Sequence, residues 1–211
     1  MISTEIKLES RDESKNRFLN AALHVIRVKG YSATRIEDIC EAAGLTKGSF
    51  FYHFESKEAL ALDAADYWTE GSEALFASAP YRDQADPLDR LLAYVDFRKA
   101  LLTGDLADFT CLAGTMVQEV YVTHPALREA CNRTLTGHAG ILVPDIEEAM
   151  RQRGMHPEWT AESLALYTQA TIQGAFILAK AANGAAVAAQ CIDHLHSYLE
   201  LLFIQPVKEG V

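Results

Sequence analysis

Residues 43–54 of the chain read Ala-Gly-Leu-Thr-Lys-Gly-Ser-Phe-Phe-Tyr-His-Phe, and this stretch decides how the N-terminal part of the protein folds. Gly44 favours a left-handed helix end and Thr46 is a strong N-cap, so one helix should end and the next begin within a few residues. In that next helix Phe50 and Phe54 share one face, and polar side chains occupy the opposite arc. The stretch therefore predicts the turn and second helix of a helix-turn-helix, whose second helix can enter the major groove of DNA.

Upstream of this stretch, two more helices are expected. Apolar residues recur at helical spacing over 12–29, and Gly30 stands where a left-handed C-terminal cap belongs. Thr34 can cap a short second helix that ends at Gly44. Together with the helix that follows Thr46, these predict a small three-helix DNA-binding domain.

Downstream, the helical pattern continues nearly to the end of the chain. Ser56 should cap a fourth helix that reaches about Ser78, and the Pro-containing stretch 79–87 is the first clear linker. Pro144 falls inside a later helix, where a bend is expected. No strand pattern competes, so the sequence predicts an all-α protein of about nine helices, with a helical bundle after the helix-turn-helix domain. The helices expected beyond the linker cover about 87–102, 109–121, 125–153, 161–182 and 186–204.

The net charge of −10 argues at first against a nucleic-acid partner, because a phosphate backbone attracts Lys and Arg. Residues 1–60, however, hold nine of the 19 basic residues and nine of the 29 acidic residues, so this part is neutral overall. The excess of acid therefore belongs to the rest of the chain. The first 60 residues are free to present a local basic face to DNA.

Composition and motif spacing exclude several other classes of protein. Hydrophobic residues make up 49% of the chain, which rules out disorder, yet no apolar stretch reaches the roughly 18 residues that span a bilayer. No apolar signal core opens the chain, so we expect a cytoplasmic protein without a membrane partner. The histidines form no ligand set, and neither a metal nor another cofactor is expected. The cysteines lie far apart and should be free thiols: Cys40, Cys111, Cys131 and Cys191.

The third helix offers the groups that DNA recognition needs. Gly48 lets the backbone come close to DNA, and Lys47 adds a positive charge to the free N–H groups of the first turn. Tyr52 and His53 can bond phosphate oxygens, and Phe51 can contact a thymine methyl. Taken singly, each of these residues also fits an ordinary cap, a solvated charge or a core aromatic. The residues expected to contact DNA are Thr34, Arg35, Thr46, Lys47, Gly48, Ser49, Phe51, Tyr52, His53 and Lys57.

The stretches 30–34, 36–39, 43–54 and 56–60 closely resemble the N-terminal signature of the TetR family of transcriptional regulators. The resemblance covers about residues 12–65 and is highly specific. It implies a DNA-binding domain, here 1–56, followed by an effector-binding and dimerisation domain, here 57–211. It also implies a homodimer on a palindromic operator, most often a repressor that a small molecule releases, with the activator role left open. Phe51 departs from the many members that carry Tyr, which puts a hydroxyl contact to phosphate in doubt there.

Two C-terminal helices carry more apolar surface than the core of one subunit needs. Apolar residues occupy two faces of the helix over 161–182, and the helix over 186–204 shows the same excess. Pairing with their twofold mates into a four-helix interface would bury the surplus, so we expect a homodimer through these two helices. The alternative is a monomer with a thick core.

Residues of the middle helices can line an effector cavity that is mostly apolar, with Gln118, Glu119 and Gln173 as polar groups. The expected effector is an apolar or electrophilic small molecule. Aromatic residues at helical spacing are more often plain core, which is the alternative interpretation. The residues expected to contact the effector are Trp68, Phe97, Leu101, Cys111, Met116, Tyr121, Tyr167, Gln173, Phe176 and Lys180.

Cys111 stands at the start of a predicted helix, where a thiol has a lowered pKa and more thiolate. Lys180, if nearby, would stabilise the thiolate further. The stretch 109–112, with 174–180 later, resembles the corresponding part of TetR-family regulators that sense reactive electrophiles. A buried, inert cysteine is the alternative.

A small helical enzyme that uses the C-terminal cavity is the alternative function. The sequence holds no nucleophile elbow, phosphate loop or metal-spaced cluster that would support it. We therefore expect a regulator without enzymatic activity.

Overall fold

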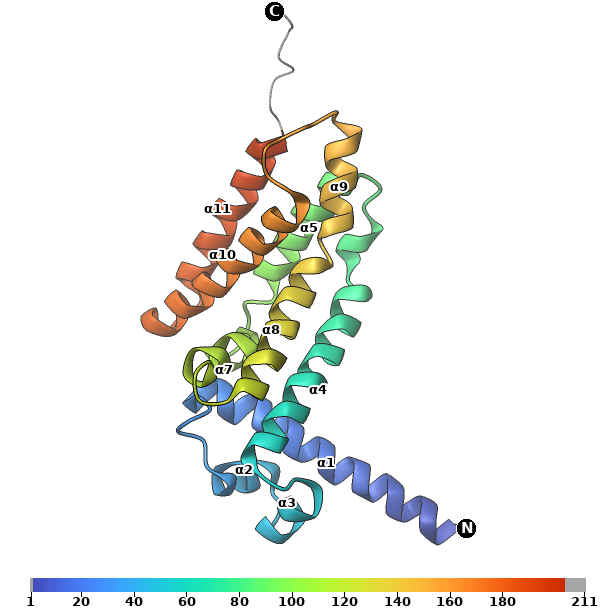
Figure 1. Cartoon of the computed structure of the whole chain (residues 1–211), viewed down its shortest axis with the longest axis vertical. Coiled ribbons are helices and arrows are strands. Elements are labelled where there is room, and N and C mark those ends of the chain that lie inside the picture. The colour runs from blue at the N-terminus through green and yellow to red at the C-terminus, as the bar shows by residue number, and fades with distance from the viewer. Residues whose placement is uncertain (1, 204–211) are drawn as a thin grey trace, which may run out of the picture. The chain divides into compact units, whose positions relative to one another are not determined.

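The computed structural model describes residues 2–203, with side chains from Asp12 onward, and this part of the chain is helical without any strand (Figure 1). None of its helices is long and apolar enough to cross a membrane. The elements are α1 (Ile2–Lys29), α2 (Ile36–Ala43), α3 (Lys47–His53), α4 (Lys57–Ala77), the 3-10 helix η1 (Pro80–Asp83), α5 (Pro87–Ala100), α6 (Leu106–Phe109), α7 (Leu112–Val120), α8 (Pro125–Gly140), α9 (Val143–Gln152), α10 (Ala161–Ala182) and α11 (Ala186–Phe203).

The all-α prediction is confirmed, and the described residues form more helices than the nine expected for two local reasons. The predicted helix over 125–153 is divided into α8 and α9 at the expected place. Pro144 stands in the first turn of α9, where its missing N–H costs no helical hydrogen bond. The predicted helix over 109–121 begins later, because Cys111 is the N-cap of α7 and the short α6 precedes it.

The prediction that Thr34 caps α2 is wrong. The N-cap is Arg35, whose backbone N–H donates to the Asp38 carboxylate at 2.9 Å. Thr34 is buried, and its hydroxyl donates to the Gly30 carbonyl at 2.6 Å. Asp38, at the third position of the helix, thus accepts the hydrogen bond from the N–H of the N-cap residue, as in a capping box.

The chain divides into two compact units, and the first comprises Met1–Ser72 with Thr110–Thr134. In this unit α2 and α3 lie side by side against α1, and α7 packs on α1 as well (Figure 1). These helices, together with the parts of α4 and α8 that belong to this unit, contribute fully buried side chains to the core. They include Phe18, Ile26, Ile39, Phe50, Leu60, Met116 and Leu127.

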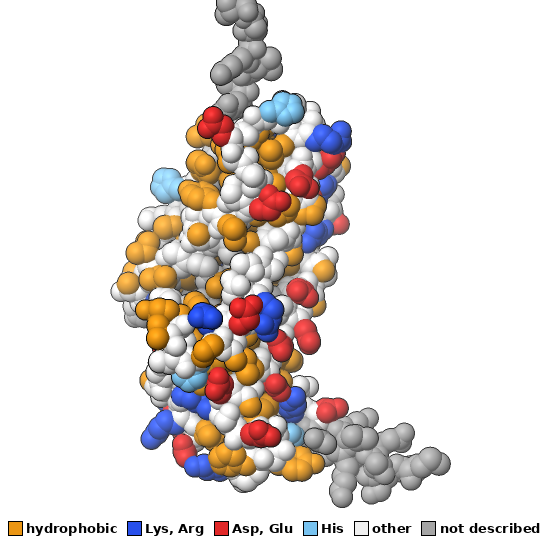
Figure 2. Space-filling view, in the orientation of Figure 1, with side chains coloured by type: hydrophobic (Ala, Val, Ile, Leu, Met, Phe, Trp, Pro, Cys, Tyr) orange, Lys and Arg blue, Asp and Glu red, His pale blue; other side chains and the backbone are white. Residues whose placement is uncertain are grey.

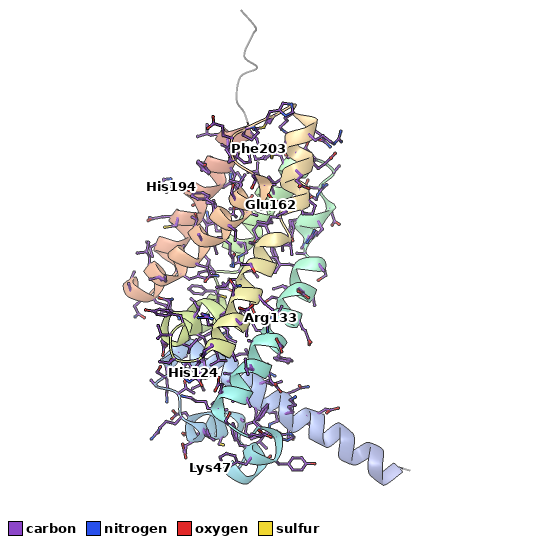
Figure 3. All side chains as sticks on the ribbon, viewed as in Figure 1. Lys47, His124, Arg133, Glu162, His194 and Phe203 are labelled. Carbon is purple, nitrogen blue, oxygen red and sulfur yellow. The ribbon has the colours of Figure 1, made fainter. Side chains whose placement is uncertain are left out.

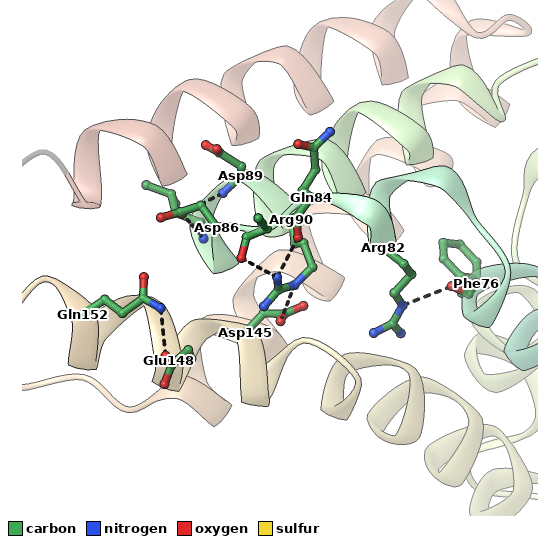
Figure 4. A network of polar contacts seen from close by, with 11 residues as sticks. Phe76, Arg82, Gln84, Asp86, Asp89, Arg90, Asp145, Glu148 and Gln152 are labelled. Atoms are coloured by element: carbon green, nitrogen blue, oxygen red, sulfur yellow. Dashed lines mark hydrogen bonds and ion pairs between the residues drawn. The ribbon is translucent and has the colours of Figure 1, made fainter.

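The second unit comprises Glu73–Phe109 with Leu135–Val211. Here α5 packs against α9 and α11, and α10 and α11 form an antiparallel pair (Figure 1). Arg90 ties the start of α5 to α9: its guanidinium bonds the Asp145 carboxylate at 2.9 Å and the backbone carbonyls of Gln84 and Ala85 (Figure 4). The functional division at residue 56 stays a prediction, since the units reflect packing rather than activity.

Candidate nucleic-acid interface

One face of α3 is anchored in the core of the first unit by aromatic rings. Phe50 and Phe54 are buried, and their rings lie 5.6 and 6.1 Å from the ring of Phe18 on α1, edge to face. At the start of α3 the Thr46 hydroxyl accepts a hydrogen bond from the Ser49 N–H at 3.1 Å, as the sequence predicts. Both ends of this short helix are therefore held in one orientation.

The turn between α2 and α3 is fixed by a residue that the sequence analysis did not identify. Gly44 adopts a φ of 62°, in the left-handed region that favours glycine. The Arg17 guanidinium, on α1, donates to the carbonyls of Ala43 at 2.6 Å and Gly44 at 3.3 Å. Arg17 thus supplies donors for carbonyls at the C-terminal end of α2.

The opposite face of α3 is largely exposed, although the rings of Phe51 and Tyr52 contact those of Phe50 and His53. Phe51 is 51% exposed and Tyr52 is 66% exposed. A Cβ added at Gly48 would approach only the Thr46 hydroxyl, at 3.8 Å, so the fold has no steric need for glycine there. Glycine weakens a helix by about 1 kcal/mol relative to alanine, and no close contact among the described residues requires a glycine at position 48.

Lys47 begins α3 on this exposed side (Figure 3) and pairs with Glu37 of α2. The Lys47 ammonium lies 2.7 Å from the Glu37 carboxylate, and both side chains are more than half exposed. The hydrogen bond from Lys47 is the main cause that lowers the pKa of Glu37. Acidic and basic side chains are interspersed over this end of the unit (Figure 2). The ammonium group of Lys47 is therefore exposed on the surface but already paired with a carboxylate.

Three residues expected to contact DNA form hydrogen bonds within the first unit. Thr34 is buried, as described above. His53 lies 2.7 Å from the Ser14 hydroxyl through Nε2, and its ring packs 6.1 Å from that of Phe18. Lys57 donates to the carbonyls of Tyr31 and Thr34, both at 2.9 Å, and burial is the main cause that lowers its pKa. The hydrogen bonds of His53 and Lys57 connect separate segments of the first unit. The predicted contacts that stay on the surface are Arg35, Thr46, Lys47, Gly48, Phe51 and Tyr52, with Ser49 partly exposed.

Comparison with known families identifies this arrangement. Residues 18–64 match the model of bacterial regulatory proteins of the tetR family. Residues 87–193, about half of the chain, match the C-terminal domain of LmrA/YxaF-like transcriptional regulators. The chain belongs to the TetR family of transcriptional regulators.

Among individual TetR-family proteins, one is similar to a short part of this chain and two are similar to most of it. The transcriptional regulator YerO of Bacillus subtilis is 40% identical over 57 residues, which are 27% of this chain and only 20% of YerO. LmrA of the same organism is 27% identical over 177 residues, covering 82% of this chain and 90% of LmrA. The crystal structure of a TetR regulator from Chloroflexus aurantiacus superimposes with a TM-score of 0.79 at 29% identity, over 91% of this chain and 96% of that one.

In this TetR-family chain the turn before α2 is also held by α7, through a residue that the sequence suggested for an effector cavity. The Glu119 carboxylate accepts hydrogen bonds from the backbone N–H groups of Tyr31, at 3.2 Å, and Ser32, at 2.7 Å. Lys57 holds the same turn from its carbonyl side and stacks over the Tyr31 ring. Any displacement of α7 would thus act directly on the segment that enters α2.

The residues predicted to contact the effector are distributed over both units. In the first unit Met116 is fully buried, Tyr121 is 56% exposed, and the ring of Trp68 is covered by the Arg27 guanidinium at 4.8 Å. Cys111 is buried at the start of α7, and its sulfur accepts a hydrogen bond from the Gly114 N–H at 3.4 Å. Its neighbour Cys131 has a pKa raised to about 12, mainly by burial.

In the second unit two of the predicted residues pack against other aromatic rings. Phe97 packs 5.5 Å from Phe76, and Phe176 lies 6.1 Å from Phe109. Tyr167 instead packs on Tyr198 at 5.1 Å and is 47% exposed. The remaining predicted residues, Leu101, Gln173 and Lys180, are partly buried.

Proposed function

We propose that this chain is a homodimeric repressor that binds a palindromic operator through α3 and releases it when a small molecule binds the C-terminal domain. The observation that carries the proposal is the two-sided character of α3. Its inner face is fixed by Phe50 and Phe54, while Gly48, Phe51 and Tyr52 lie exposed beside Lys47. A rigid helix with one protruding polar and aromatic face suits the major groove of DNA.

The exposed groups of α3 divide into two roles. Lys47, Tyr52 and the first-turn N–H groups contact phosphates and set the position on the duplex. Phe51 reads a thymine methyl, and Arg35 at the start of α2 reaches the neighbouring backbone. Sequencing the DNA that the purified protein retains from a random pool tests this function. Enrichment of a palindrome supports it, and a pool without any enriched sequence would refute it.

The dimer forms through α10 and α11. Both helices bury one face in their own unit and leave large apolar side chains exposed on the other. Four such helices, two from each subunit, pack into a bundle that removes this surface from water. The exposed side chains are Leu166, Tyr167, Ile177 and Leu178 on α10 with Tyr198 and Leu201 on α11.

Replacing Lys47 with alanine should weaken binding to every DNA sequence. Because Lys47 neutralises one phosphate, the slope of log affinity against log salt should fall by about one unit. Glu37→Gln should act in the opposite direction and raise affinity, since it frees Lys47 from its carboxylate. Fluorescence anisotropy with a labelled operator at several salt concentrations measures both effects.

The matched control for Lys47 is Lys99→Ala, which removes the same charge from α5, where Lys99 pairs with Asp193. Its salt slope should equal that of the parent protein. Exposed ion pairs contribute only about 0–1 kcal/mol, so all three variants should fold. If Lys47→Ala keeps the parental slope, Lys47 is not part of the DNA interface.

A covalent effector chemistry is favoured by one feature, the position of Cys111 as the cap of α7. Modification of its sulfur would remove the hydrogen bond to Gly114 at one end of the helix whose other end carries Glu119. Serine is an equally good N-cap but a poor nucleophile at neutral pH. Cys111→Ser should therefore bind the operator normally and stay bound when p-benzoquinone is added.

Substitution of Cys40, Cys131 or Cys191 by serine provides the controls, and these variants should still be released by the quinone. Gel shifts at graded quinone concentrations report the outcome. Release of Cys111→Ser at the same doses as the parent would eliminate the covalent chemistry and leave a reversibly bound effector.

A further inference from the structure

Arg98 of α5 lies inside the second unit without a carboxylate partner. It is 9% exposed, and no carboxylate of the described residues lies within ion-pair distance of it. A hydrogen bond of 3.0 Å joins its Nη1 to Nε2 of His138. The guanidinium also lies 5.3 Å from the ring of Phe76 and 5.5 Å from that of Phe176. A permanent positive charge is thus buried among aromatic rings.

His138 cannot supply the missing negative charge. A guanidinium only donates hydrogen bonds, so Nε2 of His138 must present its lone pair to Arg98. The Tyr94 hydroxyl lies 3.0 Å from the same nitrogen. Burial, and then the charge of Arg98, lower the pKa of His138 to about 3. The imidazole is therefore neutral, and Arg98 stays uncompensated.

Three other arginines of this unit do form ion pairs with carboxylates. Arg90 pairs with Asp145 (Figure 4), Arg153 with Asp86, and Arg151 with Glu148. A buried unpaired charge is costly, whereas an apolar residue of similar volume at position 98 would avoid that cost. An arginine that is buried despite this desolvation cost is typical of a binding site.

Unpartnered polar atoms occur on the helix that faces Arg98. Nε2 of Gln173 and Oε1 of Gln169 are buried without a hydrogen-bond partner in the described residues. Gln169, Gln173 and Phe176 are spaced four and three residues apart, so they share one face of α10. Buried polar groups are nearly always bonded, so exceptions call for a ligand or an ordered water.

Arg98 has more hydrogen-bond donors than its neighbours use. Its guanidinium carries five N–H donors, and the described residues that bond it are His138 and Tyr94. Donors of the planar group are therefore left for another partner. Two such donors on one edge of a planar guanidinium match the two oxygens of a carboxylate.

We propose that Arg98 binds the head group of a monoanionic effector, whose apolar body packs against Phe76, Phe97 and Phe176. The proposal rests on the ligand-responsive function proposed above and specifies its ligand class, a carboxylate or sulfonate with an aromatic or aliphatic body. The amide groups of Gln169 and Gln173 bond polar atoms further along the ligand. The anion supplies the negative charge that no described residue provides to Arg98.

Two fluorescent probes of similar shape test the proposal without DNA: anionic 8-anilinonaphthalene-1-sulfonate and neutral N-phenyl-1-naphthylamine. Arg98→Gln should weaken binding of the sulfonate about 30-fold, the usual order for charge-assisted hydrogen bonds in a desolvated site. Binding of the neutral probe should change less than about twofold, because its body meets the same rings. Arg151→Gln removes the same charge from the surface of this unit and should leave both titrations unchanged.

Equal loss of both probes, or no loss of the sulfonate, would overturn the assignment to Arg98. Circular dichroism checks that the variants fold. Arg98→Lys is a second variant, which keeps the positive charge but loses the planar guanidinium, and its affinity for the sulfonate should lie between those of the parent and of Arg98→Gln. In the parent protein decanoate should displace the sulfonate at concentrations at least tenfold below those of 1-decanol, and equal potency would also refute the proposal. Operator binding is measured separately, so failure to bind DNA would refute the proposed function without affecting these titrations.

Discussion

Five base pairs inserted between the two half-sites of the operator should lower the affinity of the dimer by about 10³-fold, to the level of non-specific DNA. The reason is geometric. A symmetric dimer presents its two α3 helices to half-sites roughly 34–36 Å apart, one turn of the duplex. The insertion rotates one half-site by about half a turn, so only one α3 can enter its groove. Anisotropy titrations at constant salt measure the loss.

An operator in which the five central base pairs are replaced, but not lengthened, serves as the control and should bind almost as tightly as the original. We expect the spacing to be strict because Gly48, Phe51 and Tyr52 lie on the exposed face of a helix that is fixed at both ends. Binding that survives the insertion undiminished would show that the subunits do not act as one rigid pair.

Acidification from pH 7 to pH 5 should remove about 2 kcal/mol of folding stability through His138 alone. Its folded-state pKa of about 3 lies far below the ordinary histidine value, mainly because the ring is buried and secondly because Arg98 faces it. Between these two values the unfolded chain binds a proton that the folded protein refuses. Stability therefore rises with pH through this window and is lost as pH falls. Urea unfolding at a fixed protein concentration measures it.

His138→Gln isolates this effect, because an amide oxygen still accepts the hydrogen bonds of Arg98 and Tyr94 but does not titrate. The variant should lose about 2 kcal/mol less than the parent over the same pH range. Identical pH profiles for His138→Gln and the parent would show that His138 is not held neutral.

Local signals in the sequence were sufficient to predict most helices. Thr46 and Ser56 accept backbone hydrogen bonds at the starts of α3 and α4, as expected from a cap. The range predicted for α10 agrees with the structure at both ends. Such signals act through neighbours within four residues, so they are visible in the sequence itself.

Predictions for single side chains were less secure where two orientations were open to them. His53 ends α3 and Lys57 begins α4, and the sequence predicts that both contact DNA. In the structure their partners are Tyr31, Thr34 and Ser14, which lie far along the chain. These partners come within reach because α1, and the turn that follows it, pack against α3 and the start of α4.

The sequence by itself thus determined the family, the helices and the two-faced character of α3, because caps, breaks and helical periodicity are properties of adjacent residues. Tertiary structure alone decided which polar groups are left without partners. Glu119 reaches a turn 87 and 88 positions earlier in the chain, and Arg98 meets His138 at a separation of 40. Whether a charged side chain finds a partner depends on which residues the fold brings next to it. The spacing of residues in the sequence does not encode those contacts.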